Sequence, residues 1–225
     1  MLFTEAYAVY RKLLCQIGGG SPTIEGRLFG SGCLISNHHI LTARHVVNTL
    51  PDFTEWPVVL KYDGLFQCDI LFESSEHDLM ILEANRRIAT SSQPAPTEFP
   101  EFVVGHPKFG SSVGHIARLK STTEDGRTNS HTYFSPSTVS MYAPSRPDEA
   151  TMYVLANGIV QPGFSGCPVF GADRTLHGIL VQCYQFPIHS ENQITQIHSL
   201  PIMSPVFPIR AEIDSALNRD TGATL

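Results

Sequence analysis

Three residues whose types and order could support nucleophilic catalysis occur in the chain: His45, Asp78 and Ser165, separated by 33 and 87 residues. A serine hydroxyl is a weak nucleophile at neutral pH, so a base has to take its proton as it attacks. An imidazole can do so because its ordinary pKa, about 6.5, lies near neutral pH. A carboxylate then fixes the imidazole tautomer and stabilises the imidazolium. The order His, Asp, Ser is a known order for acyl-transfer triads, so the sequence predicts these roles for His45, Asp78 and Ser165.

The residues around Ser165 predict a tight turn that could stabilise a negatively charged intermediate. The segment from Gly163 to Pro168 reads Gly-Phe-Ser-Gly-Cys-Pro. Glycine at position 163 suits unusual backbone angles and the close approach of a substrate. In such a turn the N–H groups of Gly163 and Ser165 can converge on one oxygen, so we expect them to form an oxyanion hole.

A second carboxylate, Asp69, competes with Asp78 for the orienting role. Asp69 falls in the middle of the apolar run Cys68–Phe72, whereas Asp78 follows a polar turn and directly precedes the run Leu79–Leu82. We therefore expect Asp78, and not Asp69, to be the partner of His45.

The histidines raise the alternative of a metal site. His38 and His39 are adjacent, and neighbouring residues of a strand point to opposite faces, so they cannot easily bind one ion. No His-Glu-x-x-His or comparable spacing occurs. The sequence therefore predicts neither a metal nor another cofactor.

Short apolar runs between turn signals would have to position these residues. The runs are about 4–8 residues long, and glycine (17) and proline (16) are plentiful between them. No helical period persists across them, which predicts an all-β barrel or sandwich of about ten to thirteen strands. Short helices are expected over Thr4–Leu14 and Ile209–Leu217. Ser121–Pro147 is rich in Ser, Thr, Pro and Asn and predicts a long surface excursion, with one hairpin within it.

The overall composition indicates which kinds of binding partner and which cellular compartment to expect. A net charge of −6 over 225 residues argues against broad binding to nucleic acid or to an anionic membrane. No apolar run approaches the roughly 20 residues of a membrane helix, and Glu5, Arg11 and Lys12 interrupt any signal-peptide core. The five cysteines are odd in number and include no Cys-x-x-Cys pair. We therefore expect an intracellular, cytoplasmic protein.

Three segments of the chain resemble the active-site blocks of the chymotrypsin-like (trypsin-fold) serine peptidases. They are Leu41–Val47 around the histidine, His77–Leu82 around the aspartate, and Gly163–Val169 around the serine. Gly30–Ser36 and Val103–Gly110 are similar to stretches of the HtrA/Deg-like group, so that the matches span residues 28 to 185. The resemblance implies a double antiparallel β-barrel with the triad between the barrels. No PDZ domain is expected after the peptidase domain.

The resemblance also implies a substrate pocket. In the family its base lies six residues before the nucleophile, which here is Ile159, followed by Val160. Val181-Gln182-Cys183 resembles the strand that lines the pocket and binds the substrate backbone. Because no acidic residue stands at the base, we expect a small or medium apolar residue before the cleaved bond.

Three positions depart from the pattern of trypsins. Phe164 stands where trypsins carry an aspartate that pairs with a freed N-terminus, so activation by that ion pair cannot operate. Cys167 replaces a glycine beside the nucleophile. Arg44 replaces a small residue next to His45 and could charge the edge of the site.

These features together predict the organisation and function of the chain. We expect an N-terminal helical segment (1–20), a peptidase domain (21–208) with barrels at about 21–95 and 99–208, and a C-terminal helix and tail (209–225). The expected activity is that of a serine endopeptidase acting on protein or peptide substrates. Two alternatives stay open: a catalytically silent binding module, and a protease that needs a regulatory protein partner.

Overall fold

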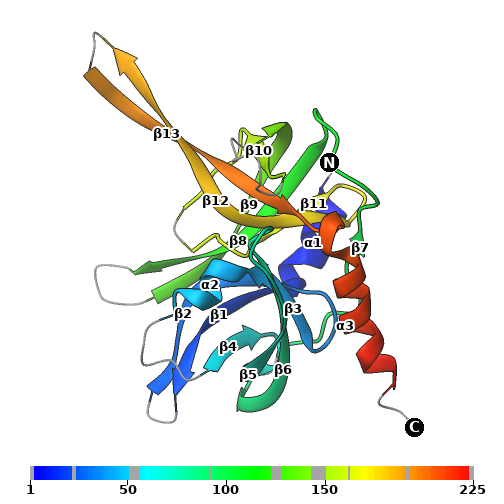
Figure 1. Ribbon diagram of the computed structural model, residues 1–225. Helices are drawn as coiled ribbons and strands as arrows, with labels where there is room; N and C mark the ends of the chain where they lie inside the picture. Colours follow the sequence, from blue (N-terminus) through cyan, green and yellow to red (C-terminus); the bar gives the residue numbers. More distant parts are fainter. Residues whose placement is uncertain are drawn as a thin grey trace.

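The structure, a computed structural model, consists mainly of two β-barrels with a helix at each end of the chain (Figure 1). It describes residues 3–21, 24–50, 56–91, 93–122, 128–142, 151–161, 163–190 and 193–222. Thirteen strands occur within these ranges. The all-β class and the double antiparallel barrel predicted from the sequence are confirmed.

The first barrel is closed and has six strands in the spatial order β1–β2–β3–β6–β5–β4. Their bounds are Leu14–Ser21 (β1), Ile24–Leu34 (β2), His39–Ala43 (β3), Trp56–Lys61 (β4), Gly64–Ser74 (β5) and Leu79–Thr90 (β6). All five residues of β3 are buried, because this strand is paired on both sides and carries the apolar run before His45.

This barrel begins at Leu14, earlier than the expected boundary at residue 21. β1 pairs with both β2 and β4, within the N-terminal segment (1–20) that was expected to be helical. The glycines have a packing reason: a Cβ on Gly20 would lie 2.8 Å from Val58 Cγ1 and 3.1 Å from Trp56 Nε1. At its glycines the strand can therefore run close to its neighbour.

The second barrel also has six strands, in the order β11–β8–β9–β10–β13–β12, and closes through β11 and β12. Their bounds are Ser112–Thr122 (β8), Thr128–Tyr142 (β9), Tyr153–Ala156 (β10), Pro168–Gly171 (β11), Thr175–Ser190 (β12) and Gln193–Pro205 (β13). The two-residue strand β7 (Glu101–Phe102) pairs in parallel with the start of β12.

The surface excursion expected over Ser121–Pro147 differs from the structure. Residues 121–122 end β8, and residues 128–142 form the whole of β9, which pairs with β8 from Thr128 to Thr138. Its Thr, Tyr, Phe and Val residues favour strands, and Ser135 and Ser137 are buried, so the polar composition misled the prediction. The other residues of the expected excursion lie outside the described ranges.

Helix α1 (Thr4–Leu13) joins the two barrels, because it leads directly into β1 while packing on the second barrel. The buried ring of Tyr10 stacks on Phe170 of β11, with centroids 4.0 Å apart, and its hydroxyl donates to the Arg174 carbonyl at 3.1 Å. The predicted C-terminal helix is present as η1 (Phe207–Ile209) followed by α3 (Arg210–Gly222). No helix within the described ranges is long and apolar enough to cross a membrane.

Candidate active site

The base and the carboxylate named from the sequence, His45 and Asp78, contact each other. His45 lies in the short helix α2 (Arg44–Asn48) after β3, and Asp78 immediately precedes β6. Nδ1 of His45 lies 2.6 Å from Oδ2 of Asp78, and the His45 backbone N–H donates to Oδ1 at 2.9 Å. An ionised carboxylate only accepts, so Nδ1 carries the proton and Nε2 keeps its lone pair. His45 is thus held in the tautomer that suits a general base.

The turn that carries Asp78 is fixed by both barrels. Asp78 has a φ of +50°, a left-handed conformation that aspartate tolerates better than most residues. Its carbonyl accepts the N–H of Arg44 at 2.9 Å. The carbonyl of the preceding residue, His77, accepts the hydroxyl of the buried Ser204 in β13 at 2.6 Å. The orientation of the carboxylate therefore depends on the packing of one barrel against the other.

Two other residues named from the sequence lie outside this arrangement. Asp69 accepts a hydrogen bond from the side-chain amide of Asn85, so it is engaged away from His45. Arg44 forms an ion pair with Glu73, with Nε and Oε2 3.3 Å apart, and does not line the cavity described below.

Ser165 lies in the loop before β11, and Ser31 of β2 holds this loop. The N–H of Ser31 donates to the Ser165 carbonyl at 2.9 Å, and its hydroxyl donates to the Gly163 carbonyl at 3.0 Å. The N–H of Gly166 donates to the Leu180 carbonyl at 2.7 Å. Gly166 has a φ of +90°, and a Cβ on it would overlap the Ser31 carbonyl oxygen, so only glycine fits. Hydrogen bonds from both barrels therefore hold the loop in place.

Two N–H groups of this loop, those of Gly163 and Ser165, donate to no group among the described residues. The neighbouring N–H groups are used: Phe164 donates to the Gln161 carbonyl at 3.1 Å, and Cys167 to the Phe164 carbonyl at 2.9 Å. Gly163 has a φ of +91°, and no heavy atom lies within 4 Å of a Cβ built on it. Open space beside two unused donors suits an oxygen that gains negative charge.

Neutral contacts inside the second barrel support the segment that leads to Ser165. Phe164 is buried, and its ring centroid lies 6.1 Å from that of His115 and 6.2 Å from that of Tyr133. Nε2 of His115 donates to the Ile159 carbonyl at 2.8 Å, and the Ser135 hydroxyl accepts the Ile159 N–H at 3.1 Å. Burial lowers the pKa of His115 to about 4, so this side chain is neutral at pH 7.

A cavity of about 620 Å³ lies where the two barrels meet, and both His45 and Ser165 line it. No hydrogen bond joins these two side chains among those of the described residues. Four of the residues named for the substrate pocket also line the cavity: Val160, Val181, Gln182 and Cys183. Ile159 does not, because its backbone is held by the barrel interior while its side chain is 50% exposed.

Several residues of the site carry no signal in the sequence. Leu180, Gln185 and Ser199 line the cavity, and Ser31 and His115 position the Ser165 segment. Ser31 lies in a stretch that resembles a family motif, but its contact with the loop joins residues 132 positions apart. No rule based on residue spacing could have found Leu180, Gln185, Ser199 or His115.

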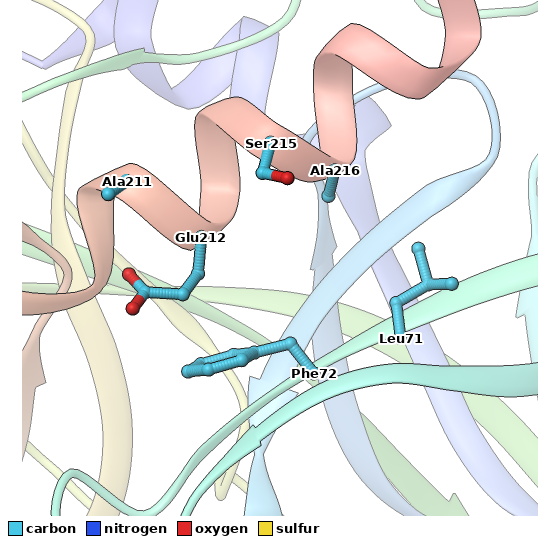
Figure 2. A pocket seen from close by; sticks show the side chains of 6 residues that line it. All are labelled: Leu71, Phe72, Ala211, Glu212, Ser215 and Ala216. Atoms are coloured by element: carbon cyan, nitrogen blue, oxygen red, sulfur yellow. The ribbon is translucent and has the colours of Figure 1, made fainter.

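A second hollow, of about 320 Å³, lies between β5 and α3 (Figure 2). It is lined by Leu71, Phe72, Ala211, Glu212, Ser215 and Ala216. Its one hydroxyl nucleophile, that of Ser215, has no histidine among the lining residues to take its proton. The cavity beside Ser165 is therefore the better candidate for catalysis.

The fold and the site together define the class of the protein. Residues 30–179 match the family described as the trypsin-like peptidase domain, which is two thirds of the chain. The chain belongs to this family, and the prediction of a trypsin-like serine protease is confirmed. A comparison with curated proteins found no match.

Solved structures of other proteases share the fold. The inactive form of Rv3671c from M. tuberculosis is 15% identical with a TM-score of 0.55, over 98% of this chain and 92% of that chain. The serine endoprotease from Yersinia pestis is 18% identical with a TM-score of 0.57, over 96% of this chain and 66% of that chain. The MamO protease domain from Magnetospirillum magneticum is 16% identical with a TM-score of 0.56, over 92% of this chain and 98% of that chain.

Proposed function

We propose that this protein is a serine endopeptidase that cleaves peptide bonds through an acyl-enzyme on Ser165. The observation that carries the proposal is the paired His45 and Asp78 at the cavity that Ser165 also lines. Membership of the trypsin-like peptidase family supports it independently.

In this proposal each group has a role. Asp78 keeps the proton of His45 on Nδ1, so that Nε2 can take the proton of the Ser165 hydroxyl as it attacks the scissile carbonyl. The carbonyl oxygen gains negative charge and accepts the N–H groups of Gly163 and Ser165. His45 then donates its proton to the leaving amine, and a water molecule hydrolyses the acyl-enzyme by the same route in reverse.

The cavity wall favours a small or medium apolar residue before the cleaved bond. Val160, Leu180 and Val181 contribute apolar surface, and none of the described residues that line the cavity is acidic. A lysine or arginine side chain would enter without a counter-charge and lose its hydration. A peptide library checks this preference, and cleavage mainly after Arg or Lys would contradict it.

A fluorophosphonate probe tests the nucleophile, because it reacts only with an activated serine. We expect labelling of the wild type and of Ser199→Ala, a cavity serine without a proposed role, but not of Ser165→Ala. His45→Ala should lose labelling as well. A folded wild type that is never labelled would support the silent binding module instead. Labelling only after addition of another protein would support the partner-dependent alternative.

A further inference from the structure

The side chain of Asp78 has few contacts of its own to hold it in place. Within the described residues, both hydrogen bonds that reach its carboxylate come from His45, one from the backbone N–H and one from Nδ1. The side chain is 24% exposed, so packing encloses it only in part. The direction of the carboxylate relative to His45 must therefore be set largely by the backbone that carries Asp78.

That backbone has a conformation that needs support. The φ of Asp78 is +50°, where the Cβ of an L-residue approaches a neighbouring carbonyl oxygen. A conformation of this kind persists only where the surrounding contacts fix it. Since a change in φ would swing the Cα–Cβ bond of Asp78, the contacts that fix φ also aim the carboxylate.

Three hydrogen bonds of the described residues hold this turn, and each controls a different part of it. The Arg44 N–H donates to the carbonyl after the Asp78 Cα at 2.9 Å, and the His77 N–H donates to the Ser74 hydroxyl at 3.2 Å. The Ser204 hydroxyl donates at 2.6 Å to the carbonyl of the peptide group that joins His77 to Asp78. This planar group moves as a unit, and its rotation about the N–Cα bond of Asp78 is the φ angle itself.

Ser204 is well placed to hold the peptide group. It is buried in β13, where it pairs with Ile179 of β12. Its neighbour Met203 pairs with Tyr153 of β10, so the strand is fixed on both sides. Without the hydroxyl, the partly buried His77 carbonyl would lose its partner, which costs more than the bond itself gains. The peptide group would then gain by rotating toward another donor.

Resting on the proposed function, we propose that Ser204 is a positioning residue for catalysis. Its hydroxyl holds the peptide group between His77 and Asp78 in the orientation that directs the Asp78 carboxylate at Nδ1 of His45. Ser204 does not line the cavity and acts only through Asp78. The second barrel thus supplies the support of a histidine–aspartate pair whose two members both belong to the first barrel.

Heteronuclear NMR of the imidazole rings tests this role without any substrate. In the wild type the proton of neutral His45 should be on Nδ1, because the Asp78 carboxylate accepts it there. In Ser204→Ala we expect that signal to weaken and the proton to distribute over both ring nitrogens. Ser140→Ala removes a hydroxyl that donates to the Val154 carbonyl at 3.0 Å within the second barrel. It is the matched control and should give the wild-type signal.

Steady-state kinetics measure the consequence for the reaction. Ser204→Ala should lower kcat about tenfold, as the loss of one hydrogen bond would give. KM should change little, because the residues that line the cavity are unaltered. Ser204→Thr keeps a hydroxyl and should restore most of kcat. Ser204→Cys keeps the volume but offers only a weak donor, so it replaces alanine if that variant does not fold and should also lose kcat.

A double-mutant cycle separates positioning from a general loss of stability. If Ser204 acts through Asp78, its removal should matter little once the carboxylate has gone. In an Asp78→Asn background, Ser204→Ala should therefore lower kcat by no more than about twofold. A tenfold loss in both backgrounds would assign the effect to the fold as a whole and overturn the positioning role.

The two readouts distinguish this inference from the proposed function. Loss of the Nδ1 proton signal in Ser204→Ala supports the positioning role even if the wild type is never labelled by fluorophosphonate. A labelled and active wild type, together with an unchanged signal and an unchanged kcat in Ser204→Ala, would overturn the positioning role and leave the peptidase intact.

Discussion

Acid should destabilise this protein through the buried histidine His115. Its ring lies in the interior of the second barrel, and Nε2 donates to the Ile159 carbonyl on the segment that leads to Ser165. Burial lowers its pKa from 6.5 to about 4, against the smaller opposing effect of that hydrogen bond. The folded protein therefore resists protonation of this ring.

The magnitude follows from the two pKa values. Between pH 6.5 and about 4 the unfolded chain binds this proton and the folded protein does not, so stability falls as the pH falls through this window. Each tenfold difference in proton affinity is worth about 1.4 kcal/mol. On going from pH 7.5 to pH 4.5, His115 alone should lower the free energy of unfolding by about 2.5 kcal/mol.

Urea denaturation at the two pH values measures this loss, with His115→Gln as the comparison. The glutamine amide can donate to the Ile159 carbonyl but does not titrate. His177, whose pKa burial also lowers, contributes in the same direction to both proteins and cancels in the comparison. The wild type should lose about 2.5 kcal/mol more than the variant. An equal loss in both proteins would refute the assignment to His115.

Three further changes test the packing and the triad. Gly166→Ala should leave little folded protein, because the new Cβ would overlap the Ser31 carbonyl oxygen. Gly163→Ala has a similar φ but lies in open space, so it should lower the free energy of unfolding by about 1–2 kcal/mol. Equal thermal destabilisation of the two variants would contradict the steric reasoning. Tyr10→Phe should lower the free energy of unfolding by about 1 kcal/mol, since the buried ring loses one hydrogen bond; a urea midpoint identical to that of the wild type would count against it. Asp78→Asn should reduce kcat by roughly 10⁴ because His45 takes the wrong tautomer; steady-state rates near the wild-type value would exclude the orienting role.

Local patterns in the sequence predicted the strands better than they predicted the ends of the barrels. The run before His45 contains the apolar residues Ile40, Leu41 and Ala43, and β3 is buried throughout. The glycines of β1 and the polar residues of β9 misled the prediction, because both strands are fixed by pairing partners distant in sequence. The two strands show that barrel closure overrides local propensity.

The sequence alone determined the protein's class and the candidates for its chemistry. His45, Asp78 and Ser165 could be named because nucleophilic catalysis demands those residue types, and because each stands beside an apolar strand or a tight turn. The sequence favoured Asp78 over Asp69, and the tertiary structure places Asp78 against the histidine. Only the tertiary structure decided that Ser31 and His115 hold the serine segment. The reason is physical. A residue's type limits what it can do, but its partner is set by the packing of two barrels whose contacting residues lie far apart along the chain.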